Sequence, residues 1–301
     1  MKRVIVLGLL LTAGTLSLWA ASLQNRQAGG AAANPPLEVQ KVKDRLYMIT
    51  GGCQCGNTAV FVTDGGVVVV DTKNPGTGKG ILEKIKTVTD KPVTMIINTH
   101  THQDHTGSNE DFPTSVDIVT HENTKTNMMK MPNFQGDKAR YLPKRTYKDK
   151  LSIGKGKDEI DLYYFGRAHT NGDTFVVFPA AAAVHAGDVF AGKTTPIIDT
   201  MNGGSAVEYG KTLAKAASTL KNVDTIITGH STLMKPADLK EYADFNNDFI
   251  TWVQGEIKAG KSVDQAAMEY KIPAKYSGYT VTTFFGGIRG NIQTAYEELK
   301  K

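Results

Sequence analysis

The sequence predicts a mixed α/β domain with sheets in the middle and helices outside. Continuous apolar runs at 67–70 and 93–97 are typical of strands that are buried on both faces. Between these runs Ile81, Ile85 and Val88 recur with helical spacing. Strands that alternate with helices in this way are typical of α/β folds.

The remaining elements follow from the same patterns, taken in chain order. Strands are expected at 46–49, 58–62, 67–70, 93–97, 117–120, 160–165, 174–178, 183–186 and 225–227. Helices are expected at 80–88, in a stretch that runs through 128–129, and at 209–220. Two more are expected to begin at Pro236, which suits a first helical position, and after Ser262, which suits a cap. The glycine-rich stretch 51–57 is expected to be a hairpin loop.

The N-terminus is typical of a secretory signal. Two basic residues precede an apolar segment at 4–18, and small residues follow at 20–22. We expect a signal peptide at 1–21, a flexible tether at 22–36 and one folded domain at 37–301. The protein is therefore expected to be periplasmic or secreted, with no stable membrane span after cleavage. An uncleaved anchor is the alternative, although the apolar segment is short for a span.

The C-terminal part of the folded domain, from about 236 to 301, is expected to be a helical extension. It contains Trp252, Tyr276, Tyr279, Phe284 and Phe285. These aromatic residues would close one wall of a pocket, and core packing explains them equally well.

The formal net charge of +5 is small for 301 residues, and the lysines are dispersed along the chain. No arginine-rich stripe or alternation of basic and aromatic residues is present. We expect a small-molecule substrate and no nucleic acid.

The chain has two cysteines, Cys53 and Cys55, separated by one residue. In an exported protein they can form a disulfide. Two residues of extended chain span about 6.6 Å, near the upper limit of Cα separation for a disulfide. A Cys53–Cys55 bridge would therefore be strained unless the loop bends. Two free thiols and a soft-metal site are the alternatives.

Four metal-ligating side chains lie within six residues, directly after the expected strand at 93–97. They are His100, His102, Asp104 and His105. The whole chain has only seven histidines, so three in this stretch form a dense cluster. Neutral imidazole and carboxylate are the ligands that zinc takes in sites that activate water. The sequence therefore predicts a metal site at the end of a strand.

Three further candidate ligands share this local context. His169, Asp188 and His230 each follow an apolar run or a turn and have small residues beside them. Because strand ends are rigid, the loops beyond them can converge on one cleft. Asp71, at the end of the strand at 67–70, is a candidate acceptor for the second ring nitrogen of a ligating histidine, with a plain turn role as the alternative.

The motif His-x-His-x-Asp-His, followed in order by the three downstream ligands, resembles the metallo-β-lactamase superfamily. The resemblance covers 37–230 and includes the segments 56–58 and 69–71, and it is weaker over the C-terminal seventy residues. It implies an α/β fold of the αββα type: two mixed β-sheets flanked by helices, with a binuclear zinc site at one edge.

The resemblance also divides the seven ligands between two ions. It implies a first zinc at His100, His102 and His169, a second at Asp104, His105 and His230, and Asp188 as the bridge between them. Two Zn²⁺ ions are the implied cofactors, with iron or manganese as alternatives. A hydroxide shared by the ions would be the nucleophile, and Asp104 is also assigned as the catalytic residue.

The predicted function is that of an exported zinc-dependent hydrolase acting on an ester, lactone, thioester or amide bond. Asp188 and the absence of any cysteine after Cys55 resemble glyoxalase-II-like thioesterases, lactonases and phosphodiesterases more than β-lactamases. The first alternative is a metallo-β-lactamase. An iron-dependent redox enzyme and a non-catalytic metal-binding scaffold are the others.

Three residues outside the ligand set are predicted substrate contacts. Cys53 and Cys55 lie in a loop that is expected to overhang the cleft, and Asn171 lies two residues after His169. For each of them a structural role, in a staple or a turn, is the alternative. His121 and His185 match no ligand position. Packing is expected for His121, and a core or ligand-supporting position for His185.

Overall fold

The computed structural model describes residues 34–300. The predicted signal peptide at 1–21 and the predicted tether up to residue 33 lie outside the described residues. From residue 36 onward the chain forms one compact unit. None of the helices within 34–300 combines the length and the apolar character that crossing a bilayer requires.

The first sheet has seven strands in the order β1-β2-β3-β4-β5-β6-β7. Their bounds are Glu38–Lys43, Leu46–Thr50, Thr58–Thr63, Gly66–Val70, Val93–Ile97, Asp117–His121 and Arg145–Tyr147. The pairs from β1 to β4 are antiparallel, and those from β4 to β7 are parallel. Helix α2 (Gly78–Lys86) connects the parallel strands β4 and β5.

The second sheet has five strands in the order β12-β11-β10-β9-β8. In chain order, β8 to β12, their bounds are Lys150–Ile153, Ile160–Tyr163, Phe175–Phe178, Ala183–His185 and Thr225–Ile227. Only the pair β11 and β12 is parallel.

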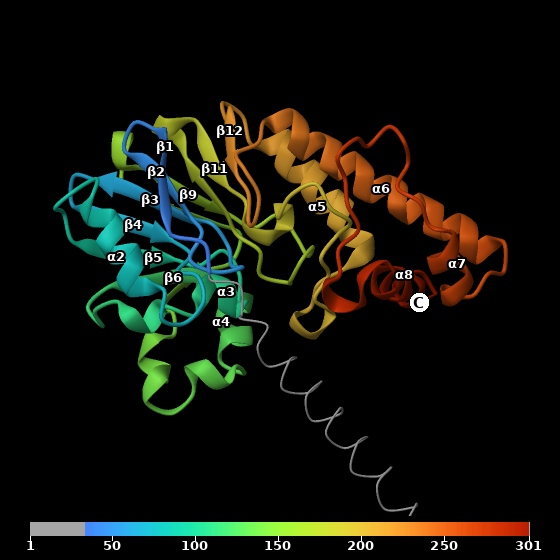
Figure 1. Cartoon of the computed structure of the whole chain (residues 1–301), viewed down its shortest axis with the longest axis horizontal. Coiled ribbons are helices and arrows are strands. Elements are labelled where there is room, and N and C mark those ends of the chain that lie inside the picture. The colour runs from blue at the N-terminus through green and yellow to red at the C-terminus, as the bar shows by residue number, and fades with distance from the viewer. Residues whose placement is uncertain (1–33, 301) are drawn as a thin grey trace, which may run out of the picture. The chain divides into compact units, whose positions relative to one another are not determined.

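The two sheets pack face to face and helices cover both outer faces (Figure 1). Phe61 of β3 and Phe178 of β10 meet between the sheets with ring centroids 5.0 Å apart. Ile81 and Ile85 of α2 pack on the outer face of the first sheet. The expected αββα sandwich of mixed sheets is confirmed.

Six further α-helices lie in the described part of the chain. They are α3 (Gln103–Thr106), α4 (Glu122–Met128), α5 (Ala206–Thr219), α6 (Pro236–Lys258) and α7 (Val263–Glu269), with α8 (Gly287–Leu299) at the C-terminal end. Tyr209 of α5, Phe249 of α6 and Ile292 of α8 share one core with the outer face of the second sheet. The C-terminal helices therefore belong to the same packed unit as the sandwich.

Most expected elements are present, with shifted ends. Helix α6 begins at Pro236, and the Ser262 hydroxyl accepts from the backbone of Gln265 to cap α7. The strands expected at 160–165, 174–178 and 183–186 are each shorter than predicted. Strands β1, β7 and β8 and the short helix α3 had not been expected, whereas α8 lies within the helical extension expected from about 236 to 301. β1 carries charged residues and is mostly exposed, so no apolar pattern marks it.

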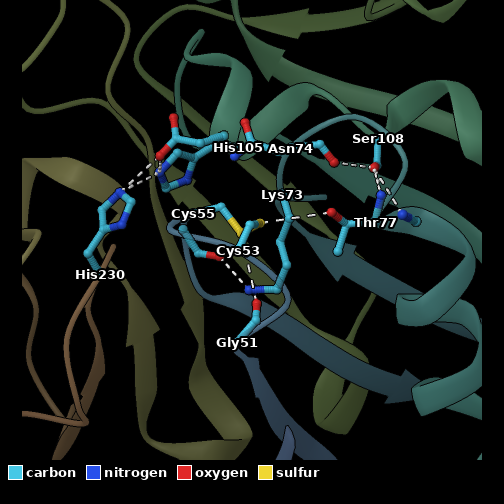
Figure 2. Close-up of a disulfide and its surroundings, with 12 residues drawn as sticks. Gly51, Cys53, Cys55, Lys73, Asn74, Thr77, His105, Ser108 and His230 are labelled. Atoms are coloured by element: carbon cyan, nitrogen blue, oxygen red, sulfur yellow. Dashed lines mark hydrogen bonds and ion pairs between the residues drawn. A yellow bond between two sulfur atoms is a disulfide. The ribbon is translucent and has the colours of Figure 1, made fainter. Parts of the chain in front are cut away.

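The loop between β2 and β3 is the expected hairpin loop, and it contains a Cys53–Cys55 disulfide (Figure 2). Its Cα atoms are 5.2 Å apart, well within the normal range. The chain bends at Gln54, the residue between the two cysteines, so their Cα atoms lie closer together than in extended chain. The strain expected for an extended loop is therefore absent, and the alternatives of free thiols and a soft-metal site do not hold.

Candidate metal centre

All seven predicted ligands meet at one edge of the sandwich. The segment that follows β5 supplies the first four, two of them from the short helix α3. His169 lies between β9 and β10, Asp188 follows β11, and His230 follows β12. The side chains come from the ends of strands in both sheets, so the rigid sandwich fixes their relative positions.

The first group consists of His100, His102 and His169. Nδ1 of His102 lies 3.2 Å from Nε2 of His100 and 2.9 Å from Nε2 of His169. Oδ2 of Asp188 is 4.0 Å and 3.8 Å from the same two Nε2 atoms. Bonds of about 2.0–2.1 Å to a tetrahedral zinc place ligand atoms about 3.3–3.4 Å apart. The four atoms therefore fit around one ion.

The second group consists of Asp104, His105 and His230. Nε2 of His230 lies 3.3 Å from Nε2 of His105 and 3.1 Å from Oδ2 of Asp104. Asp188 lies beside this group too, with Oδ1 3.2 Å from His105 and Oδ2 3.2 Å from His230. Asp188 thus faces both groups, as its predicted bridging position requires.

Each buried or half-buried histidine of the two groups has a partner for the ring nitrogen that does not face the other ligand atoms. His102 Nε2 lies 2.7 Å from Oδ2 of Asp199, and His169 Nδ1 lies 2.6 Å from the carbonyl oxygen of Ile197. His100 Nδ1 lies 3.0 Å from the hydroxyl of Thr99. Such partners fix the tautomer and the ring orientation, and leave the other nitrogen free for a metal.

Asp71 supplies the corresponding partner for His105. Its Oδ2 is 2.7 Å from His105 Nδ1, and the same carboxylate accepts from the backbone and the hydroxyl of Thr99. The side chain is fully buried. These contacts match the supporting role expected for Asp71 rather than a plain turn.

Two glycines allow the surrounding loops to approach the ligands. A Cβ on Gly56 would lie 2.1 Å from Cε1 of His105, and a Cβ on Gly229 would lie 2.0 Å from Oδ1 of Asp188. No side chain fits at these distances. The disulfide loop therefore lies directly against the second group, and its Gly56 amide donates to the carbonyl of Asp104.

Lys73 anchors this loop and was not identified from the sequence. It is fully buried, and its ammonium donates to the carbonyl oxygen of Gly56 over 2.7 Å (Figure 2). Burial lowers the pKa of Lys73 to about 8, although the carboxylates of Asp71 and Asp104 act in the opposite direction. A lysine after a strand gives no sequence signal of burial, because lysines are mostly exposed.

The electrostatic environment differs between the two groups. Burial and the neighbouring imidazoles lower the pKa of His100 well below its usual value, and burial and His102 lower that of His169 to about 4. Both are neutral at pH 7, the form that binds metal. Burial also lowers the pKa of His230, but the carboxylates of Asp188 and Asp104 outweigh it and raise the value to about 9.

The other predicted residues lie outside the ligand cluster. The side-chain oxygen of Asn171 accepts from Asn127, so the amide connects the loop after His169 to helix α4. His121 caps α4 and stacks on Tyr164. His185 is buried and lies 3.0 Å from the carbonyl oxygen of Asn57. The packing expected for His121 and His185 is confirmed, and substrate contact by Asn171, Cys53 and Cys55 stays a prediction.

Asp199 is the supporting residue that the sequence did not reveal. It lies thirty residues after His169 in a loop without a motif, and only the fold brings its carboxylate to His102. The backbone contact from its amide to the carbonyl of His169 is likewise a product of the tertiary structure.

The chain is an α/β sandwich protein. Its candidate metal centre consists of two groups of histidine and carboxylate side chains and lies at one edge of the sandwich. Within that class the family is identified by its sequence. The family model described as "Metallo-beta-lactamase superfamily" matches residues 52–230, more than half of the chain. The protein is a member of the metallo-β-lactamase superfamily, which is a superfamily of hydrolases.

Two relatives and one solved structure are similar to this chain. Metallo-beta-lactamase type 2 of Elizabethkingia meningoseptica is 27% identical over 209 residues, which are 65% of this chain and 79% of the relative. The 2,4-dinitroanisole O-demethylase subunit alpha of Nocardioides sp. (strain JS1661) is 31% identical over 169 residues, 54% of this chain and 50% of the relative.

The solved structure is that of the sec-alkylsulfatase Pisa1 from Pseudomonas sp. It matches with a TM-score of 0.71 at 14% identity and covers 87% of this chain and 50% of that chain. At this identity the likeness shows the fold alone. The chain spans about half the length of the demethylase subunit and of the alkylsulfatase.

The supporting carboxylates give a first prediction. Asp71→Asn should lower the affinity of the second group for zinc by about 10- to 100-fold, because His105 loses its anionic partner. Asn tolerates the φ of 61° at this position. Asp199→Asn is the matched variant and should weaken the first group instead. Competitive titration with a zinc indicator measures both. Zinc affinities within twofold of the wild type in both folded variants would contradict the assignment.

The raised pKa of His230 gives a second prediction. At pH 7 a group with a pKa of about 9 holds a proton, and metal binding requires the neutral ring. Metal uptake should therefore release protons, and the affinity should rise with pH up to about 9. Calorimetric titration at pH 7 in two buffers with different ionisation enthalpies measures the release. A binding enthalpy that is the same in both buffers would exclude it.

Proposed function

We propose that the protein is a hydrolase that binds two divalent metal ions at this centre, with zinc as the first candidate and iron or manganese as alternatives. The observation that carries the proposal is the position of Asp188, a buried carboxylate that faces two complete groups of ligand atoms. His100, His102 and His169 would hold one ion, Asp104, His105 and His230 the other, and Asp188 would bridge them.

The residues present fit such ions. Oδ1 of Asp188 is buried and has no hydrogen bond of normal geometry, although Nε2 of His105 lies 3.2 Å away, so this oxygen is able to bind a cation. The donor atoms are imidazole nitrogens and carboxylate oxygens, which suit zinc, iron and manganese. Two carboxylates in the ligand set offset part of the charge of two dications.

The exposed members of the centre mark the side from which substrate approaches. The side chains of His102, Asp104 and His230 are 19%, 27% and 32% exposed, whereas His100, His105 and His169 are almost completely buried. A substrate therefore reaches the centre over these three residues. A bound metal pair supplies a water of lowered pKa and a Lewis acid for the scissile bond.

For the catalytic carboxylate we propose Asp104. Burial raises its pKa, but His105 and His230 outweigh that and lower it below the usual value. It is therefore ionised at neutral pH, at the open side of the centre. An ionised carboxylate at this place orients the attacking water and accepts its proton.

For the reaction we propose hydrolysis of an ester, lactone, thioester or amide bond. The relatives are named for a β-lactam, an aryl ether and an alkyl sulfate, so the fold is not tied to one bond type. The chain also lacks a cysteine in its second group of ligands. The second candidate is β-lactam hydrolysis, which the match over 79% of a β-lactamase favours.

For the location we propose the periplasm or the exterior of the cell. The Cys53–Cys55 disulfide supports this, because disulfides persist in oxidising compartments and are rare in the cytosol. We also propose that 37–301 acts as one domain, since helices α5 to α8 share a core with the second sheet.

A panel of esters, lactones, thioesters, amides and β-lactams tests the function with and without a chelator. We expect turnover of one class, loss of it on chelation and recovery on adding zinc. His102→Ala should lower kcat/KM more than about 100-fold. This is a larger loss than the one expected when a ligand loses only its supporting hydrogen-bond partner. His121→Asn is the control, since asparagine also caps a helix. Turnover that survives chelation or His102→Ala would refute the metal-dependent mechanism.

A further inference from the structure

The described part of the chain exposes six large apolar side chains. They are Met129, Met201, Met268, Val281, Phe284 and Phe285. Phe285 contacts His102, Phe284 precedes it, and Met201 lies two residues after Asp199, the partner of His102, whereas Met268 lies on α7. Exposed apolar residues that gather beside a candidate active site indicate a binding surface rather than scattered surface residues.

Phe285 lies on the metal centre itself. Its ring stacks on the imidazole of His102 with centroids 5.6 Å apart and planes at 23°, and it lies 6.5 Å from the ring of His169. The residue is nevertheless 46% exposed. One part of the side chain therefore contacts the first group of ligands, and another part is open to whatever approaches the centre.

The backbone of Phe285 is strained. Its φ and ψ of 51° and 39° are left-handed values that a bulky residue rarely adopts. Gly286 and Gly287 follow with φ angles of 81° and 59°. Such strain costs about 1–3 kcal/mol, and it is found preferentially at active sites and ligand clamps.

Hydrogen bonds hold the strained segment against the loop that orients His169. Thr195 donates its amide to the carbonyl of Thr280 over 2.8 Å, and its hydroxyl accepts from the amide of Thr282 over 2.9 Å. Two residues beyond Thr195, the carbonyl oxygen of Ile197 contacts His169. In Figure 1 the red segment before α8 runs beside the yellow loop that leads into α5. Phe285 is therefore held rigidly above the first group.

Met201 lies on a segment that is bonded to the same histidine. It is 91% exposed and lies two residues after Asp199, the partner of His102 Nε2. The carbonyl of Asn202 accepts from Asn127 of α4, and Met129 follows α4. Hydrogen bonds thus join the segment that carries Met201 both to His102 and to the end of α4.

We propose that Phe285, with Phe284 and Met201, forms the subsite for an apolar group of the substrate next to the scissile bond. The substrate class is then an acyl compound with an alkyl or aryl group rather than a polar or charged one. This inference rests on the proposed function, since it places the acyl group over His102 when the scissile bond lies at the centre. Phe285 is its specificity-determining residue.

Straight-chain carboxylates from butyrate to octanoate probe this subsite directly, because each carries the anionic group of a hydrolysis product. Calorimetric titration of the zinc-loaded protein should show affinity rising about three- to fourfold for each added methylene. Phe285→Asn keeps a residue that tolerates left-handed φ and removes the ring, and it should reduce the rise to less than about twofold. Phe285→Leu should retain most of it. Met268→Asn, on α7, is the control and should behave as wild type.

A flat affinity series in the wild type, an absence of binding, or an undiminished rise in Phe285→Asn would overturn the subsite. A second copy of the chain on this surface would appear as a dimer that Phe285→Asn dissociates, with the carboxylate series unchanged, and would also overturn it. The test is separable from that of the proposed function. Chelator-sensitive turnover with a flat series refutes the subsite alone, whereas a steep series without any turnover refutes the hydrolase.

Discussion

The structure of the centre depends on one buried carboxylate. Asp188 lies within 3.2 Å of His105 and His230 and within about 4 Å of His100 and His169. A carboxylate buried without compensation is costly, and here the surrounding imidazoles stabilise its charge and lower its pKa well below the usual value, although burial acts the other way. The same contacts raise the pKa of His105 well above its usual value and that of His230 to about 9, although burial acts the other way on both.

The sandwich makes this arrangement possible. Asp188 follows β11, His230 follows the parallel neighbour β12, and the histidine-rich segment follows β5 of the other sheet. Face-to-face packing of the sheets, with Phe61 against Phe178, fixes the relative positions of these strand ends. Two close contacts position the disulfide loop against the centre. Gly56 packs on the ring of His105, and Lys73 donates to the carbonyl oxygen of Gly56.

The sequence predicted which seven side chains come together, because they carry a local signal. His100 to His105 stand together after an apolar strand, and the later ligands have small neighbours that permit tight turns. The αββα fold was anticipated through the resemblance, since periodicity alone indicated only alternating strands and helices. Asp71 was found because it ends a strand of the same sheet.

What the sequence could not show depends on tertiary contacts. Asp199 and Phe285 contact His102 although they lie 97 and 183 residues further along the chain. Lys73 is buried against the usual preference of lysine because a single carbonyl oxygen accepts from it. The Cys53–Cys55 disulfide depends on a bend at Gln54, whereas the expectation of strain assumed extended chain.

The most direct test of this account is a crystal structure of the zinc-loaded protein with anomalous diffraction data collected on both sides of the zinc absorption edge. The account predicts two peaks, one among His100, His102 and His169 and one among Asp104, His105 and His230, with Asp188 in contact with both. A single peak, or peaks away from Asp188, would contradict the binuclear centre.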